Sequence, residues 1–153
     1  MLAQTVGFWI AGVDARRIDV EAHVRRGAPA FAVVGLPDRA VQEARQRVRS
    51  GIEASAFTFP PTRLTVNLAP ARERKEGSGL DLAIALAVLA ASGQVPPAAA
   101  AGSGGAAALG LDGRLRPVPG VLAIAEAAAQ HGLAGLVVAP ENAAEAAMAG
   151  TVP

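Results

Sequence analysis

The chain has 153 residues, of which 52% are apolar, which favours one domain with a hydrophobic core. It has no cysteine, which excludes disulfides and thiolate metal sites and gives no sign of secretion. No apolar run reaches the roughly 18 residues of a membrane span, and the N-terminus lacks the basic start of a signal peptide. We therefore expect a cytoplasmic protein without membrane contact.

Charge and aromatic content bear on nucleic-acid binding in opposite directions. Residues 1–76 carry twelve Lys or Arg against eight Asp or Glu, a net charge of +4. Residues 77–153 carry two against five, a net charge of −3. The basic half favours a polyanionic partner such as DNA. Aromatic residues make up only 3% of the chain, few for a protein that stacks the bases of single strands.

The beginning of the chain has the pattern of three strands. Residues 18–24 alternate between apolar and polar side chains, as a half-buried strand does. β-like runs at 5–10 and 31–34 flank this strand, with turn signals at 12–14 and 26–29. We predict that the three strands form an antiparallel meander.

A long amphipathic helix is predicted next, with Asp38 as its N-cap. Its inner, apolar stripe consists of Val41, Ala44, Val48 and Ile52. Glu43 with Arg47 and Arg49 with Glu53 are pairs of opposite charge four residues apart, which we place on the outer side of the helix.

The middle of the chain is predicted to form a strand, a charged loop and a buried helix. Residues 63–68 alternate again and indicate the fourth strand. Residues 70–79 are charged and read as a loop. Residues 80–92 are apolar nearly all round, which is typical of a central, covered helix, and Gly93 ends it.

Two segments that follow are rich in turn-forming residues. Residues 95–105 consist mainly of Pro, Ala, Gly and Ser and predict a mobile surface loop. Asp112-Gly113, between residues 108–111 and 114–116, is the signal of a hairpin with a two-residue turn.

A helix at 121–131, a strand at 136–139 and a last helix from Asn142 complete the chain. Strands and helices are mixed without strict alternation, so we predict an α/β (α+β) fold with a mixed sheet. Residues 1–153 are expected to be a single domain. The last residues stand where another strand could begin, so we expect a fragment of a longer protein.

Several catalytic and ligand-binding motifs are absent. The only lysine is Lys75, and no P-loop string surrounds it, so a P-loop is excluded within this chain. Gly102-Ser-Gly-Gly105 lacks the strand–turn–helix setting of a dinucleotide loop and reads as linker. His23 shares a polar strand face with Asp19 and Glu21, which we interpret as a solvated face rather than a metal site. The second histidine stands at a helix end, where a cation suits the dipole. We predict no metal and no cofactor.

Ser78 has two interpretations. It follows Lys75 and precedes the buried helix, where it could be an exposed nucleophile. Alternatively, Ser78 and Asp81 before an apolar run form a capping box. The capping box explains both residues without catalysis, and no histidine is near in sequence to act as a base, so we favour it.

The best candidate site is a basic patch next to the start of the buried helix. It comprises Arg72, Arg74 and Lys75, extended by Arg45 and Arg49, which share one face of the preceding helix. Glycines at 77 and 79 and the free N–H groups of a helix N-terminus favour binding of a phosphate or DNA. The alternative is a solvated charged loop neutralised by Glu73 and Glu76.

Several strings, in order and over most of the chain, resemble the competence protein ComM/YifB family of magnesium-chelatase-like AAA+ proteins. They are Val34-Gly-Leu-Pro-Asp38 with Ala40, Val41, Glu43 and Arg45; Thr65-Val-Asn-Leu-Ala-Pro-Ala71; Lys75-Glu-Gly-Ser78 with Asp81 and Leu82; Leu111-Asp-Gly-Arg-Leu-Arg-Pro117 with Gly120, Val121 and Leu122; and Pro140-Glu-Asn-Ala143.

The resemblance implies a fold like ribosomal protein S5 domain 2, which the proteolytic domain of Lon shares. It also implies an N-terminal domain ahead of an AAA+ module that holds ATP and Mg beyond Pro153. The whole protein would resemble a homo-hexameric helicase that drives DNA branch migration in natural transformation. Lon's catalytic serine and lysine positions correspond to Gly79 and Leu122, so the resemblance implies no peptidase activity.

We therefore expect a non-catalytic accessory domain that contributes to ring assembly, DNA contact or both. Its partners would be DNA, bound weakly and with salt dependence, and other domains and subunits of the parent ATPase. The alternative is a protein-interaction or chaperone-like module that uses apolar surface around the second hairpin and the Ala-rich helices.

Overall fold

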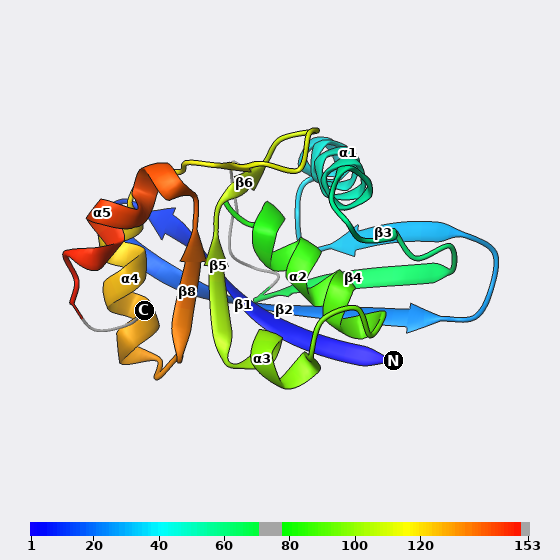
Figure 1. The fold of residues 1–153 in the computed structure, drawn as a ribbon, viewed down its shortest axis with the longest axis horizontal. Helices are drawn as coiled ribbons and strands as arrows, with labels where there is room; N and C mark the ends of the chain where they lie inside the picture. Colours follow the sequence, from blue (N-terminus) through cyan, green and yellow to red (C-terminus); the bar gives the residue numbers. More distant parts are fainter. Residues whose placement is uncertain (71–77, 151–153) are drawn as a thin grey trace.

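The computed structural model describes residues 1–70 and 78–150 and has a mixed α/β fold, which confirms the predicted class. One six-stranded sheet consists of β1 (Leu2–Ala11), β2 (Asp14–Arg25), β3 (Ala30–Val34), β4 (Arg63–Ala69), β5 (Ser103–Ala106) and β8 (Gly135–Val138). A separate small sheet consists of β6 (Ala108–Leu109) and β7 (Leu115–Arg116). The helices are α1 (Asp38–Ala54), α2 (Asp81–Ala91), α3 (Pro97–Ala101), α4 (Val121–Gln130), the 3-10 turn η1 (Pro140–Asn142) and α5 (Ala143–Ala147) (Figure 1).

The strand order in the large sheet is β3-β4-β2-β1-β5-β8, which corrects the predicted meander. β1 and β2 form the expected antiparallel hairpin, but β4 lies between β2 and β3, antiparallel to β2 and parallel to β3. Leu64, Val66 and Leu68 of β4 are almost completely buried, which suits an inner strand. Helix α1 connects β3 to β4 and supplies the crossover that a parallel pair requires.

The sheet is covered by helices on both faces around β1. Ala3 and Trp9 of β1 belong to the core that contains most of α2, whereas Val6 and Phe8 pack with Ile124 of α4. Successive side chains of a strand point to opposite faces, so α2 and α4 lie on opposite sides of β1. Figure 1 shows α2 in front of strands β1 and β2.

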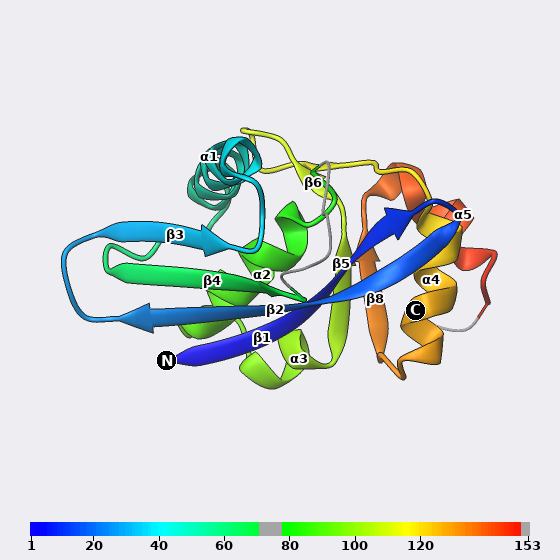
Figure 2. The same ribbon diagram turned by 180° about the vertical axis from the view of Figure 1, so that it is seen from behind.

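Beyond the start of β2, where α4 packs near Ala15, the far face of β2, β3 and β4 has no helix over it in the described part of the chain. Figure 2, the view from behind, shows these strands in front of α1 and α2. Glu21 and His23 of β2 lie opposite Asn67 and Thr65 of β4 on this face. The predicted solvated face is confirmed for His23, which is exposed.

Helix α2 is the centre of the larger core, as its apolar sequence predicts. Ten of its eleven residues are buried. Two glycines allow its close approach to the sheet: a Cβ on Gly7 would lie 2.6 Å from Leu80 Cδ2, and one on Gly105 would lie 3.2 Å from the backbone nitrogen of Ala83. Neither α2 nor any other helix within residues 1–70 and 78–150 is long and apolar enough to cross a membrane.

The prediction of a mobile loop and linker at 95–105 is wrong. Pro97–Ala101 forms α3, and Ser103–Ala106 forms β5, an inner strand parallel to both β1 and β8. The small residues of β5 are needed for packing, since a Cβ on Gly104 would lie 3.1 Å from Leu133 Cδ1 and 3.3 Å from Phe8 Cε2. The low side-chain volume that suggests a linker is here the requirement of a crowded inner strand.

Helix α1 buries the predicted stripe, with one correction at its start. Ala44, Val48 and Ile52 are buried, and Val41 packs against the same core. The N-cap is Pro37 rather than Asp38, which is the first helical residue and makes no side-chain capping hydrogen bond. The acidic side chain still lies in the first turn, where it suits the helix dipole.

The last third follows the predicted elements apart from the turn of the second hairpin. β6 and β7 are antiparallel, but they pair over only two residues each, and five residues separate Leu109 from Leu115 instead of two. Helix α4 ends before Gly132, β8 forms at the predicted place, and Asn142 stands immediately before α5.

We predict that Gly105→Ala lowers the free energy of unfolding by about 1–3 kcal/mol, because the added methyl overpacks the contact of β5 with α2. Gly102→Ala is the control: its added Cβ would have only Ala98 O within van der Waals contact, at 3.6 Å. Chemical denaturation of both variants tests this prediction. Equal stability of the two would contradict it.

Candidate nucleic-acid interface

The carboxylate of Asp81 fixes helix α1 against the core. It accepts hydrogen bonds from Arg47 Nε at 2.6 Å and Nη2 at 3.1 Å, and from the backbone N–H of Leu109 at 3.1 Å. Asp81 is 1% exposed. The contact joins α1, α2 and β6, so it sets which face of α1 points outward.

For these residues the predicted capping box and the outward placement of Arg47 are wrong, whereas the predicted ion pair of Arg47 with Glu43 is present. Ser78 and Asp81 form no capping box: α2 has no side-chain capping hydrogen bond, and only the backbone N–H of Asp81 bonds to the Ser78 carbonyl. Arg47 turns inward, and its Nη1 lies a distant 3.9 Å from Glu43. A buried carboxylate is costly unless hydrogen-bond donors surround it. This requirement outweighs the gain from a helix cap or from a more exposed ion pair.

The ionisation of this pair reflects burial and mutual hydrogen bonding. The hydrogen bond to Asp81 raises the pKa of the Arg47 guanidinium. Burial raises the pKa of the Asp81 carboxyl above its ordinary 3.8, against hydrogen bonds from Arg47 and Leu109 that lower it. Because the pKa of Asp81 is higher in the folded protein, protonation of this carboxyl favours folding. Its contribution to the free energy of unfolding is full below pH 3.8 and is lost as pH rises through the pKa that Asp81 has in the folded protein.

A hollow of about 380 Å³ lies between the outer face of α1 and strand β3. It is lined by Phe31, Gln42, Arg45, Gln46 and Arg49. The four α1 residues recur at intervals of three and four, which places them on one face of the helix. The expectation that Arg45 and Arg49 share a face is confirmed.

A second hollow of about 290 Å³ shares Phe31, Arg45 and Arg49 with the first. Its other wall is formed by residues 29–30 and 59–62. We call the two hollows together the arginine groove. The hydroxyl of Thr62, in this wall, is buried and has no hydrogen-bond partner.

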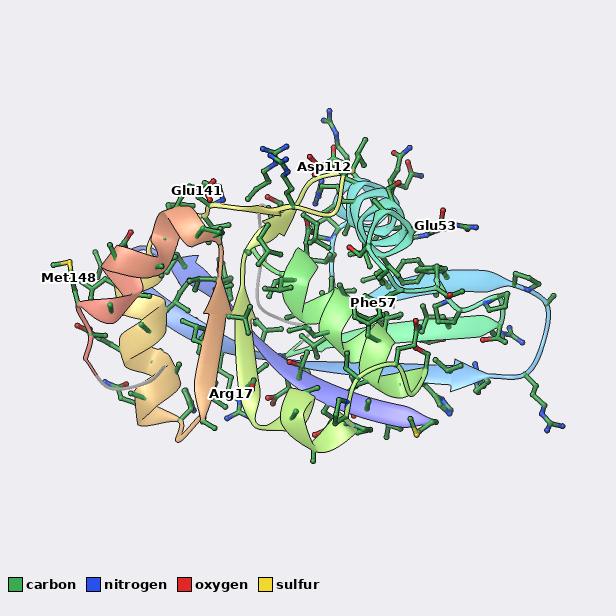
Figure 3. The ribbon with its side chains drawn as sticks, in the orientation of Figure 1. Arg17, Glu53, Phe57, Asp112, Glu141 and Met148 are labelled. Carbon is green, nitrogen blue, oxygen red and sulfur yellow. The ribbon has the colours of Figure 1, made fainter. Side chains whose placement is uncertain are left out.

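Arg49 is held in place above an aromatic pair. Its Nε donates to Glu53 Oε1 at 2.9 Å, and its Cζ lies 5.2 Å from the ring centroid of Phe59. The rings of Phe59 and Phe31 are also 5.2 Å apart. Figure 3 labels Glu53 on α1, on the side of β3. The guanidinium plane of Arg49 is thus positioned before any ligand arrives.

Arg45 is one of several exposed arginines that form no ion pair with any described residue. Arg114 and Arg116, by contrast, lie 3.8 Å and 3.6 Å from a carboxylate oxygen of Asp112. Arg45 is exposed, and Gln42 and Gln46 flank it. An unneutralised cation between two amides suits an anionic, hydrogen-bonding ligand.

Further arginines lie at the same end of the sheet as the arginine groove. Arg63 pairs in register with Ala30, which lines the groove, and on its other side with Arg25. Arg26 follows in the β2–β3 connection. All three arginines are exposed, and none makes an ion pair within the described part of the chain. They continue the positive charge beyond the groove.

The structure tests part of the predicted patch. Arg72, Arg74 and Lys75 lie outside the described residues, so their proximity to Arg45 and Arg49 stays a prediction. The sequence reasoning missed Phe31 and Phe59, which complete the groove. The one signal for them was that both flank the helix that carries the arginines.

Comparison with known proteins places this chain in a family. The family model described as subunit ChlI of Mg-chelatase matches residues 20–142, which include the whole arginine groove. The chain belongs to this family. YifB of Salmonella typhimurium, an uncharacterized protein, is 46% identical over 134 residues, 88% of this chain and 26% of that protein. Competence protein ComM of Haemophilus influenzae is 44% identical over 137 residues, 90% of this chain and 27% of that protein. The chain therefore spans about a quarter of the length of these relatives.

Of the two positions compared with the Lon dyad, Gly79 lies at another hollow of this ChlI-family chain and Leu122 does not line it. Gly79 lines a hollow of about 440 Å³ with Ser78, residues 8–10 and residues 117–119. Leu122 is not among its lining residues, and its N–H donates to Glu145 Oε2 at 2.9 Å. Among the described residues that line it, Ser78 is the one with a nucleophilic side chain, and none is titratable. Within the described residues, no three His, Cys, Asp or Glu side chains gather to hold a metal ion.

We predict that Asp81→Ala lowers the free energy of unfolding at pH 7 by about 3 kcal/mol, because it leaves Arg47 and the Leu109 N–H without their acceptor. Arg47→Met should also destabilise, and the double variant should lose less than the sum of the two. Glu53→Ala breaks an exposed pair and should cost less than about 1 kcal/mol. Urea denaturation measures all four, and additive losses would refute a direct coupling.

Proposed function

We propose that this chain is a non-catalytic accessory domain of a magnesium-chelatase-like AAA+ ATPase and that it contacts DNA through the arginine groove. The parent protein would be a homo-hexameric DNA-remodelling helicase of the kind that drives branch migration in natural transformation. Membership of the ChlI family and the similarity to a competence protein support this context.

The observation that carries the DNA contact is the exposed, unpaired Arg45 beside the stacked Arg49 in a groove on the outer face of α1. Phosphate contacts of arginine supply most of the affinity of sequence-independent DNA binding. The charged segment with Arg72, Arg74 and Lys75 is proposed as a second contact. Surfaces outside the groove would serve ring assembly with other domains and subunits.

The domain is proposed to lack chemistry and cofactors of its own. The hollow at Gly79 offers a serine hydroxyl without a base or lysine among its lining residues, and an unactivated hydroxyl is a weak nucleophile. ATP and Mg would be bound by an AAA+ module elsewhere in the parent protein. This domain would then act by positioning DNA or neighbouring subunits.

A protein-interaction or chaperone-like role is the second candidate, favoured by exposed apolar side chains. Leu111 in the second hairpin is 61% exposed. A hollow of about 470 Å³ is lined by alanines of α4 and α5 and by residues 136–138 of β8. In this case Leu111→Asp and Val137→Asp would abolish partner binding, and substitutions of groove arginines would leave it intact.

We predict that the domain binds single-stranded and four-way-junction DNA weakly, and less tightly as salt increases. Arg45→Ala/Arg49→Ala should weaken binding and reduce the slope of log K against log salt by about 0.7–0.9 for each phosphate contact removed. Fluorescence anisotropy at two or more salt concentrations measures this slope. An Arg72→Ala/Arg74→Ala/Lys75→Ala variant tests the second contact in the same way.

The matched control is Arg114→Ala/Arg116→Ala, which removes the same charge from a site where Asp112 already neutralises it. This control should change binding little. Equal loss in both double variants would show that net charge, rather than the groove, determines binding. Binding that does not respond to salt would exclude a phosphate contact.

A further inference from the structure

We propose that the arginine groove takes an unpaired nucleotide of single-stranded DNA, with its base stacked on the Arg49 guanidinium and its phosphate on Arg45. This inference rests on the proposed function and adds the form of the nucleic acid that the groove selects. It is drawn from the stack of side chains, the size of the hollows and the course of the charge.

The stack is the first argument. Arg49 Cζ lies over the ring of Phe59, 5.2 Å from its centroid, and Phe59 packs against Phe31 with 5.2 Å between the ring centroids and 50° between the ring planes. Phe31 is buried and Phe59 is half-buried, so the outermost member is the exposed Arg49. Unpaired bases stack on arginine planes as they do on aromatic rings. The hydrogen bond to Glu53 keeps this plane from rotating freely.

The size of the groove is the second argument. Its two hollows, of about 380 and 290 Å³, lie near the lower end of ligand-pocket volumes, roughly 300–1,000 Å³. They suit one nucleotide rather than a double helix. The bases of a duplex are stacked within it and cannot enter such a recess, whereas a single strand can splay a base into it.

The polar lining is the third argument. Gln42 and Gln46 each present an amide donor and an acceptor beside Arg45, a combination that can bond the edge of any base. In the opposite wall, Thr62 adds a buried hydroxyl that has no hydrogen-bond partner among the described residues. A purely apolar ligand would leave these groups unsatisfied.

The surrounding charge gives the strand a path. Ala30, which lines the groove together with Arg45, pairs in register with Arg63, and Arg63 lies opposite Arg25 in the sheet. Arg26 follows in the neighbouring connection. Phosphates on either side of the inserted base would therefore meet cations rather than carboxylates. This row of arginines favours a DNA strand over a free mononucleotide, because the single phosphate of a mononucleotide would contact Arg45 alone.

The deciding experiment compares a twelve-residue oligothymidylate with a blunt duplex of equal length, using anisotropy on the whole chain. Arg49→Lys keeps the charge but removes the plane. We expect the wild-type protein to prefer the single strand, and Arg49→Lys to reduce that preference at least about fivefold while changing duplex binding little. Phe57→Leu is the control, since Phe57 lies on the adjoining loop but does not line the groove (Figure 3).

A second readout places the base. A 2-aminopurine in the oligonucleotide should lose fluorescence on binding the wild-type protein and should keep it with Arg49→Lys. The proposed stack would be overturned if Arg49→Lys kept both the preference for single strands and the quenching. It would also be overturned if the control Phe57→Leu lost them together with Arg49→Lys.

The remaining outcomes separate this inference from the proposed function. Equal binding of single strand and duplex, both weakened by Arg45→Ala, would overturn the unpaired-base site and leave the DNA contact standing. If thymidine monophosphate competed as strongly, per mole, as the oligonucleotide, the groove would be a site for free nucleotides, and the proposal that it binds a DNA strand would be overturned. No binding of any DNA would overturn both proposals.

Discussion

The position of helix α1 depends on one buried carboxylate. Asp81 receives Arg47 from α1 and the Leu109 N–H from β6, and it does so from the first turn of the helix at the centre of the core. The apolar stripe of α1 would permit some rotation and sliding over the core, because dispersion contacts are not directional. A two-pronged hydrogen bond to a buried acceptor permits little of either. The outward direction of Arg45 and Arg49 follows from the inward direction of Arg47.

The sequence predicted most elements of the fold but not their order in the sheet. The burial of a segment can be predicted from its own residues, as the alternation at 18–24 and 63–68 and the apolar run at 80–92 show. The insertion of β4 between β2 and β3 depends on which strands pair along both of their edges, which no single segment reveals. The segment Ser103–Ala106 was missed for a similar reason. Its glycines lower strand propensity, yet α2 approaches so closely that larger residues would not fit.

The candidate site was predicted in part, for reasons that particular residues show. The spacing of Arg45 and Arg49 places them on one helix face whatever the tertiary structure is. Phe31 and Phe59 come from two other segments, and only the packing of β3 against the loop after α1 brings their rings together. The contact of Arg47 with Asp81 was missed because local rules consider only near neighbours in the sequence. Arg47 keeps its ion pair with Glu43, but its shorter bond is to Asp81, 34 residues away.

All residues that line the arginine groove belong to one continuous stretch, from Pro29 at the start of β3 to Thr62 before β4. This stretch is part of the strand–helix–strand unit β3–α1–β4, which meets the rest of the molecule through the β2–β4 ladder, the packing on α2 and the Asp81 contact. Such a unit can open as a whole while the remaining sheet stays folded. Occupation of the groove would then suppress this opening in proportion to the ligand concentration. Amide hydrogens of α1 would become slower to exchange, whereas those of β5 and β8, at the far side of the sheet, would keep their rates.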